Sequence, residues 1–378
     1  MMENNKDSTN EPIQDLREWL DRIEDIGELV RITDPVKRDE EMSAISYLLA
    51  KQNPSPAAFF EKTDGFEDSP IDAKMLWNIL GPSIRRIAVT LEEPADTPTM
   101  SLIEKVKNKL KTRISPNEIA ADEAPVFEHT LTGDDIDLDM LPIPRHWPMD
   151  GGRYAGTGDV VITRDPDNGY LNLGTYRMMQ QSKKEVGLYL SPGKDARLHI
   201  TRSWERGEPV QVAAAWGTDP LFLLVGSQTF AKNVSEYEYI GGIKNQAIPV
   251  VKGKTTDLLL PANAEIVIEG IIKPGSVKSE GPFGEFPGYY GRPEAGCPLV
   301  EVTALHYRTK PILTNALMAD YPSCEQSGFF SVIRSAKIWD DLDKLGVPGI
   351  AGVYAHPAAA GGFGMTVVSL EQRHAGHA

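Results

Sequence analysis

The stretch Glu280–Gly291 reads EGPFGEFPGYYG and places two carboxylates five residues apart among four glycines and two prolines. Five residues turn two side chains roughly 140° apart on a helix and onto opposite faces of a flat strand. Glu280 and Glu285 can therefore converge on one cavity only if the flexible backbone between them bends. Two interpretations stay open. Exposed glutamates in a turn are commoner, whereas carboxyls that face one cleft can share acid and base roles.

The composition predicts an ordinary globular protein with two or three domains. The chain has 378 residues, 41% of them hydrophobic and 25% charged, which is typical of soluble proteins. Its net charge of −15 comes without an offsetting basic stripe, which argues against nucleic acid as a partner. We therefore do not expect binding to nucleic acid.

No sequence signal points to a membrane or to an oxidising compartment. The stretch Met1–Pro12 is polar and acidic, unlike a secretory signal. The longest apolar runs, such as Leu221–Val225, are too short to span a bilayer. Cys297 and Cys324 are too few and too separated for a disulfide framework or a zinc site. We therefore expect a cytoplasmic protein with reduced thiols.

The first 125 residues interleave helical and strand-like patterns. Apolar periodicity predicts helices at Asp15–Asp25, around Met42–Leu49 and at Ser101–Leu110. Strands are predicted at Glu28–Ile32, Ala57–Phe60 and Arg86–Leu91. This alternation indicates an α/β domain over residues 1–125.

Residues 126–320 have a different texture, dominated by short strands with turn signals. Strands are predicted at Asp159–Arg164, Leu171–Met178, Pro209–Ala215 and Glu265–Lys273, and at Leu299–His306 and Pro311–Leu317, which a turn at Arg308–Lys310 would join. Helical insertions are expected at Asp219–Gly226 and Ser235–Gly242. The pattern favours a barrel or a sandwich.

Residues 321–378 read as the beginning of a third α/β domain. One helix is predicted over Gly328–Leu345, followed by strands at Gly349–His356 and Met365–Leu370. One helix and two strands make a thin core for an independent unit. We therefore expect an α+β, multidomain protein whose C-terminal domain is incomplete because the chain is truncated.

A second stretch of interest, Asn172–Arg177, reads NLGTYR in a strand that looks buried. A buried guanidinium needs a carboxylate or an anionic ligand, because an unpaired internal charge is costly. Arg177 would also suit a substrate carboxylate, which its planar fork can bind at two points. The alternative, an arginine that reaches the surface along its aliphatic stem, is equally compatible with the sequence.

Three further residues form a candidate ligand set. His199 alternates with apolar neighbours, where a lone histidine is more often a core residue than a metal ligand. Glu236 follows Ser235, a plausible helix N-cap. Neither residue, nor Asn172, supports a metal site alone. Together, an amide oxygen, an imidazole nitrogen and a carboxylate suit Mn²⁺ or Mg²⁺.

With these motifs in view, the sequence resembles the UbiD family of prenylated-flavin-dependent decarboxylases. Five separated motifs carry the resemblance in the right order, which is far more specific than any one of them. They are PIPRHW at 142–147, NLGTYR at 172–177, SEY at 235–237, PANAEIVIEG at 261–270 and EGPFGE at 280–285.

The resemblance implies a fold, a cofactor and an assembly. The fold would be an N-terminal α/β domain, a central split β-barrel like that of flavin reductases, and a C-terminal α/β domain. The cofactor would be prenylated FMN, supplied by a flavin prenyltransferase and tethered through Mn²⁺ or Mg²⁺. Whether K⁺ or Na⁺ accompanies the divalent ion stays open. A homodimer or higher homo-oligomer is expected.

The resemblance also implies roles for individual residues. The metal ligands would be Asn172, His199 and Glu236, and these residues would contact the cofactor together with Thr175, Tyr176 and Arg177. The catalytic set would be Arg177, Glu280 and Glu285. The reaction would be reversible decarboxylation of an aromatic, heteroaromatic or α,β-unsaturated carboxylic acid.

In this scheme each member of the catalytic set has its own task. Arg177 would hold the substrate carboxylate and pair with Glu280. Glu285 would give a proton to the carbon that CO₂ has left, which requires an acid that stays protonated near neutral pH. A partly buried, apolar setting near Phe283 and Phe286 could provide this.

Two departures from the family pattern support an alternative. The chain ends before most of the C-terminal domain, which usually lines the substrate pocket and takes part in dimerisation. Leu370–Gln372 also replaces an Ile-Lys-Gln-like run that members often have near the phosphate. The alternative is a flavin-binding fragment or scaffold that has lost activity through truncation.

Overall fold

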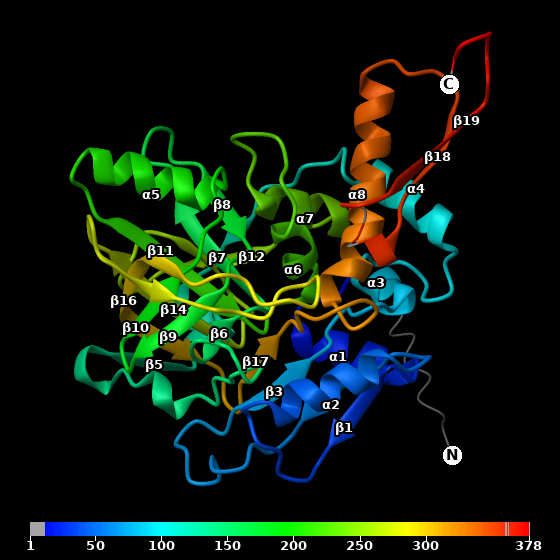
Figure 1. The fold of residues 1–378 in the computed structure, drawn as a ribbon. Helices are drawn as coiled ribbons and strands as arrows, with labels where there is room; N and C mark the ends of the chain where they lie inside the picture. Colours follow the sequence, from blue (N-terminus) through cyan, green and yellow to red (C-terminus); the bar gives the residue numbers. More distant parts are fainter. Residues whose placement is uncertain (1–11, 360, 362, 378) are drawn as a thin grey trace, which may run out of the picture.

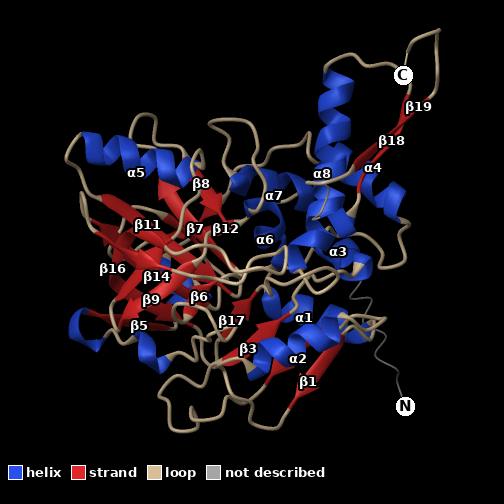
Figure 2. Ribbon diagram, in the orientation of Figure 1, coloured by secondary structure: helices blue, strands red, loops and turns tan. Residues whose placement is uncertain are grey.

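A computed structural model describes residues 12–359, 361 and 363–377 of the chain, arranged as a mixed α/β multidomain fold (Figures 1 and 2). The first eleven residues, part of the stretch expected to lack a secretory signal, lie outside the described residues. The α-helices are α1 (Leu16–Asp25), α2 (Glu41–Ala50), α3 (Ile84–Thr90), α4 (Thr99–Lys109), α5 (Asp195–Glu205), α6 (Pro220–Gly226), α7 (Glu236–Lys244) and α8 (Glu325–Lys344). None of these helices is long and apolar enough to cross a membrane, a search that covered the described residues.

The strands form two main sheets and two small ones. They are β1 (Leu29–Ile32), β2 (Ala57–Phe60), β3 (Lys74–Trp77), β4 (Asn117–Glu118), β5 (His129–Thr132), β6 (Tyr154–Gly156), β7 (Asp159–Arg164), β8 (Leu171–Gly174), β9 (Met178–Ser182), β10 (Glu185–Leu188), β11 (Val210–Trp216), β12 (Pro249–Lys252), β13 (Leu259–Pro261), β14 (Ile266–Ile272), β15 (Val277–Glu280), β16 (Glu294–Tyr307), β17 (Ile312–Asn315), β18 (Ile350–Ala355) and β19 (Thr366–Leu370). In Figure 1, α8 and the β18–β19 hairpin project away from the body.

The N-terminal sheet has the order β1-β2-β3-β17. It lies beside α1, whose apolar face is buried and whose N-cap Asp15 accepts a hydrogen bond from the backbone of Glu18. The predicted helix Asp15–Asp25 and strand Ala57–Phe60 are confirmed. The two strands predicted on either side of Arg308–Lys310 are present as β16 and β17, but β17 lies in this sheet, where it runs parallel to β3. All four β17 residues are buried, so the strand needs cover on both faces.

The larger sheet curls and runs β6-β9-β10-β16-β14-β11-β7-β8, with β15 and β5 also paired to β16. The predicted strand Leu171–Met178 is broken after Gly174, and Met178 begins β9, which lies near the opposite edge of the sheet. The break has a local cause. The Tyr176 ring folds back onto Gly174, where an added Cβ would lie 2.3 Å from it, and the Thr175 N–H donates to the Gly226 carbonyl instead of the ladder. Arg177 is thereby placed between the edge strand β8 and β9, the second strand from the opposite edge.

The predicted strand Arg86–Leu91 is instead the helix α3, and this prediction is wrong. Its β-branched residues favoured a strand, but Ile87, Ala88 and Leu91 are buried at helical spacing. The Ser83 side chain caps the helix by accepting the Arg86 N–H. The helix also carries Arg86 into the interior, where it is fully buried.

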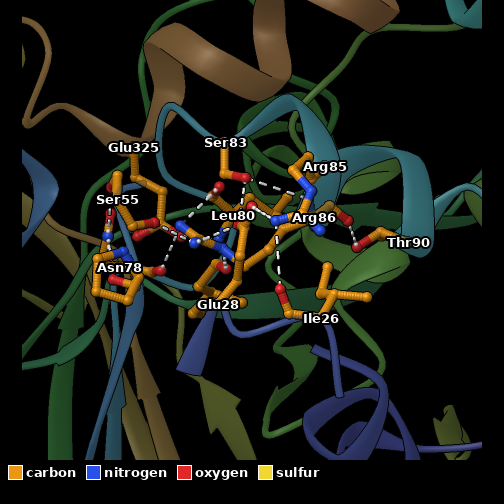
Figure 3. A network of polar contacts seen from close by, with 12 residues as sticks. Ile26, Glu28, Ser55, Asn78, Leu80, Ser83, Arg85, Arg86, Thr90 and Glu325 are labelled. Atoms are coloured by element: carbon orange, nitrogen blue, oxygen red, sulfur yellow. Dashed lines mark hydrogen bonds and ion pairs between the residues drawn. The ribbon is translucent and has the colours of Figure 1, made fainter. Parts of the chain in front are cut away.

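Arg86 lies at the centre of a polar network that joins three distant segments (Figure 3). Its guanidinium lies 3.0 Å from the Glu28 carboxylate beside β1 and donates to the Ile79 carbonyl at 2.8 Å. Glu325, the first residue of α8, accepts the Leu80 N–H at 2.7 Å and the Leu317 N–H at 3.2 Å. The network therefore ties α3 and β1 to the start of α8.

Glu325 gives the stability of this junction a pH dependence. Burial raises the pKa of Glu325 to about 7, so the folded state holds its proton more tightly than the unfolded state. The contribution is complete below pH 4.5 and is lost as the pH rises through about 7. Relative to Glu325→Gln, the parent should lose up to about 3 kcal/mol of unfolding free energy between pH 4.5 and 8. Urea denaturation at both pH values measures this difference. The exposed Glu371→Gln should follow the parent, and parallel profiles for Glu325→Gln would contradict the prediction.

Candidate active site

The two carboxylates of the opening stretch converge on Arg177. Glu280 ends β15, and Gly281 turns the chain with a φ of +85°, a conformation that suits glycine. The Glu280 carboxylate accepts two hydrogen bonds, from Arg177 Nε at 2.8 Å and from Nη2 at 2.9 Å. Glu285 accepts from Nη1 of the same guanidinium. The bend expected between these carboxylates is confirmed, and Arg177 is a largely buried, paired residue.

Aromatic rings pack against the planar guanidinium of Arg177, in addition to the carboxylates that bind its edge. Its guanidinium lies 4.0 Å from the Tyr189 ring centre and 5.0 Å from that of Phe283, and the Tyr154 hydroxyl donates to Glu280 at 2.7 Å. Burial works against the charge of Arg177, but the hydrogen bond and charge of Glu280 outweigh it and raise the pKa of Arg177. The site therefore presents a permanently charged fork in a fixed orientation.

Glu285 differs from Glu280 in its surroundings. Its side chain is 33% exposed, whereas that of Glu280 is fully buried. Phe286, expected to enclose it, stacks against Phe363 with ring centres 6.1 Å apart. Glu285 also contacts only one end of the guanidinium, whereas Glu280 occupies two nitrogens. Of the two carboxylates, Glu285 is therefore the one that can leave Arg177 and move.

Glu285 separates two cavities, and Met318 lines both. One cavity, of about 210 Å³, is lined by residues that include Thr157, Asp159, Thr175, Tyr176, Arg177 and Lys194. The other, of about 230 Å³, has four aromatic residues in its wall, Tyr47, Trp147, Tyr289 and Tyr290. We call the first the catalytic cavity. The structure thus places Thr175 and Tyr176 beside Arg177, as their shared motif predicted.

The three candidate metal ligands gather around β8 and are all buried. Asn172 lies on β8 opposite Thr163 of β7, and the Thr163 hydroxyl lies 2.9 Å from Nδ1 of His199. Glu236 begins α7 and accepts the Leu173 N–H at 2.8 Å. Ser235 holds the N-cap position as expected, although its hydroxyl makes no capping bond. His199, read as part of an alternating run, lies on the helix α5.

These residues fit a divalent cation. Burial raises the pKa of Glu236 to about 7, and among the described residues no lysine or arginine pairs with it, so a cation would stabilise its charge. Nε2 of His199 lies 3.6 Å from Asp165, too far for a hydrogen bond, which leaves one ring nitrogen available. Within the described chain no cluster of three or more His, Cys, Asp or Glu residues suits a metal. A metal held here by His199 and Glu236 would therefore need the Asn172 amide oxygen as a third ligand.

Asp150 and Gly151, which follow the PIPRHW motif, hold the loop of residues 281–285 in place, a role the sequence did not reveal; we call this loop the catalytic loop. Asp150 accepts the Gly284 N–H and the Trp147 N–H, both at 2.9 Å. The Gly151 N–H donates to the Pro282 carbonyl at 2.8 Å, and a Cβ on Gly151 would lie 2.0 Å from the Gly281 carbonyl oxygen. The paired glycines after Asp150 were the available signal, because such close backbone contact requires them.

Loss of the Asp150 clamp should loosen the catalytic loop. In Asp150→Asn, an amide NH₂ group takes the place of one of the two carboxylate oxygens that accept backbone N–H groups. A donor then faces a donor, and one backbone N–H loses its partner. We expect the free energy of unfolding to fall by about 1–3 kcal/mol, measured by urea denaturation at pH 8. That pH lies above the pKa of Asp150, which burial raises to about 6. The exposed Asp139→Asn serves as a control with no expected change. Equal stability of the two variants would contradict the clamp.

Comparison with known families identifies the class of enzyme to which this chain belongs. Residues 117–321 match the 3-octaprenyl-4-hydroxybenzoate carboxy-lyase Rift-related domain, and residues 20–106 match the N-terminal domain of the same enzymes. The chain belongs to the UbiD family of carboxy-lyases, as its motifs indicated.

Relatives agree with this assignment along nearly the whole chain. A phenolic acid decarboxylase of Escherichia coli O157:H7 is 30% identical over 96% of this chain and 75% of its own length. The UbiD-class enzyme HmfF of Pelotomaculum thermopropionicum, in an evolved dimeric form with prenylated FMN, superimposes with a TM-score of 0.87 at 30% identity, covering 97% and 81% of the two chains. The closed form of vanillic acid decarboxylase of Sedimentibacter hydroxybenzoicus gives 0.87 at 28%, covering 97% and 76%.

Proposed function

We propose that this decarboxylase acts on an aromatic, heteroaromatic or α,β-unsaturated carboxylic acid with prenylated FMN as its cofactor. The observation that carries the proposal is the Arg177 fork, held on one edge by Glu280 and touched at its far end by Glu285. HmfF, which is similar in sequence and fold, binds prenylated FMN. When bound, this cofactor supplies the electron sink that loss of CO₂ from an sp² carbon needs.

The protein side chains divide the remaining work. Glu280 binds Arg177, and Tyr154 binds Glu280, so the guanidinium is held in a fixed orientation. Its Nη1 end can therefore bind the substrate carboxylate without further reorientation. A carboxylate that arrives at Nη1 displaces Glu285 from the same atom. Once released from the guanidinium, Glu285 takes up a proton from solvent, to which its side chain is partly exposed, and delivers it to the carbon that CO₂ has left. Asn172, His199 and Glu236 would hold Mn²⁺ or Mg²⁺ and, through it, the cofactor phosphate.

The assembly and the domains follow the same family pattern. We propose that the curled sheet forms a split β-barrel between an α/β domain of residues 1–125 and the α/β region of residues 321–378. The protein would form a homodimer or a larger homo-oligomer, which the dimeric form of HmfF supports. Size-exclusion chromatography with light scattering tests the assembly, and a monomer at micromolar concentration would contradict it.

Reconstitution tests the function. The protein is loaded with prenylated FMN and Mn²⁺, and a panel of cinnamic, hydroxybenzoic, furoic and pyrrole carboxylic acids is screened for release of CO₂. Turnover of at least one unsaturated or aromatic acid is expected, and saturated analogues should be inert because they offer no sp² carbon. A bound flavin spectrum without turnover of any acid would overturn the proposal and favour a flavin-binding scaffold.

A further inference from the structure

Asp159 is a carboxyl group without a partner in the wall of the catalytic cavity. It begins β7, is 2% exposed, and lines the cavity together with Tyr176 and Arg177. Neither of its oxygens forms a hydrogen bond with another residue that the structure describes. Buried polar groups are nearly always hydrogen-bonded, and an isolated buried carboxylate is costly. Its position therefore indicates a ligand group that the protein itself does not supply.

The strand register places Asp159 on the same face as the metal-ligand set. Asp159 and Thr163 lie on one face of β7, because side chains alternate along a strand. Asn172 is paired directly with Thr163 and shares that face. Thr163 lies four positions after Asp159 in the sequence, which corresponds to about 13 Å along the strand. One end of this face therefore carries the set proposed to hold the phosphate, and the other end carries Asp159.

The chemistry of Asp159 matches a ring better than a phosphate. A carboxylate would repel a phosphate, whereas a protonated carboxyl offers one donor and one acceptor side by side. Burial raises the pKa of Asp159 well above its ordinary value of 3.8, which favours the protonated form. The pyrimidine edge of a flavin presents the complementary pair, an imide N–H beside a carbonyl oxygen.

We propose that Asp159 binds the pyrimidine edge of the flavin ring, donating to a ring carbonyl and accepting from the imide N–H. This inference rests on the proposed function, since it needs a flavin in the catalytic cavity. It assigns to Asp159 a contact at the ring end of the cofactor. Arg177, Glu280 and Glu285 would act on the substrate. Asn172, His199 and Glu236 would hold the cofactor phosphate through the metal ion.

Titration of the metal-loaded protein with FMN tests the contact without any need for turnover. FMN carries the same pyrimidine ring and phosphate, and its fluorescence reports binding in the presence of Mn²⁺. Asp159→Ala removes the carboxyl and should raise the Kd for FMN at least about 10-fold. Asp159→Asn keeps one donor and one acceptor and should stay within about threefold of the parent. If Asp159→Ala fails to fold, Asp159→Ser serves as the truncation with the same expected loss.

Thermal unfolding of the flavin-free protein separates binding from structure. Removing an unpartnered buried carboxyl should leave the Tm of Asp159→Ala unchanged or raise it, whereas a structural aspartate would lower it. Asp219→Ala is the matched control, because Asp219 is also buried but lies at the N-cap of α6 and pairs with Lys244. It should lower the Tm and leave the Kd for FMN unchanged.

The possible failures are distinguishable. If Asp159→Ala binds FMN within twofold of the parent, the contact is overturned while the proposed function stands. If Asp159→Asn binds as weakly as Asp159→Ala, the paired donor and acceptor are overturned. If the parent itself binds no FMN with Mn²⁺ present, the cofactor assignment under the proposed function fails, and this inference fails with it.

Discussion

Glu285→Gln is expected to lower the rate of decarboxylation by about 10²- to 10⁴-fold in the enzyme loaded with prenylated FMN and Mn²⁺. Glutamine keeps the size of the side chain and can still accept a hydrogen bond from Arg177, but it cannot deliver a proton. The Kd for FMN should change little, because Glu285 lies at the boundary of the catalytic cavity and not among the proposed metal ligands. Steady-state release of CO₂ measures the effect.

A matched control for this variant lies in the following strand. Glu294 begins β16, its side chain is 32% exposed against 33% for Glu285, and it also pairs with an arginine, Arg292. Glu294→Gln should retain the parent rate. Full activity of Glu285→Gln would remove Glu285 from the mechanism. Equal losses in both variants would show that the effect is not specific to the catalytic loop.

Arg86→Leu is expected to lower the free energy of unfolding by about 3–5 kcal/mol. The substitution leaves the buried Glu28 carboxylate without its buried partner and orphans the carbonyls of Ile79 and Leu80. Burial lowers the pKa of Arg86 only to about 10, so the side chain is charged at neutral pH. Urea denaturation followed by circular dichroism at pH 7 measures the change.

The neighbouring arginine provides the control. Arg85 also contacts Glu28, at 3.3 Å, but its side chain is 43% exposed, so Arg85→Leu should cost no more than about 1 kcal/mol. The double variant Glu28→Leu/Arg86→Leu should be less destabilised than Arg86→Leu alone, because no charge remains buried. A loss below about 1 kcal/mol for Arg86→Leu would show that the network in Figure 3 contributes little to stability.

Local sequence allowed Glu280 and Glu285 to converge but left a turn with exposed glutamates open, and the catalytic roles of Arg177, Glu280 and Glu285 came only from the family resemblance. Glu280 and Glu285 stand in a run whose glycines and prolines allow a bend, and that bend is present. Arg177 belongs to the NLGTYR motif. Four other motifs elsewhere in the chain support the family resemblance that this motif indicates. The metal-ligand set could be named only through the family resemblance, since His199 alone was indistinguishable from a core histidine.

The structure departs from what the local sequence favours where contacts between distant segments decide the outcome. The sequence at 86–91, rich in β-branched residues, favours a strand, yet it is a helix because Arg86 finds its partners just before β1 and in the segment after β3. β17 follows β16 closely but pairs with β3, more than two hundred residues earlier in the chain. Sequence periodicity carries no information on which distant segment will satisfy a buried strand or charge.

The sequence by itself determined the residue types of the candidate site and the family, because side-chain chemistry and motif order are local properties. Only the tertiary structure decided how Arg177 divides its nitrogens between Glu280 and Glu285, and that Asp150 clamps the loop that carries them. It also placed the unpartnered Asp159 in the cavity wall. Such features depend on which groups lack or share partners, and that is settled only when segments distant in the chain pack together.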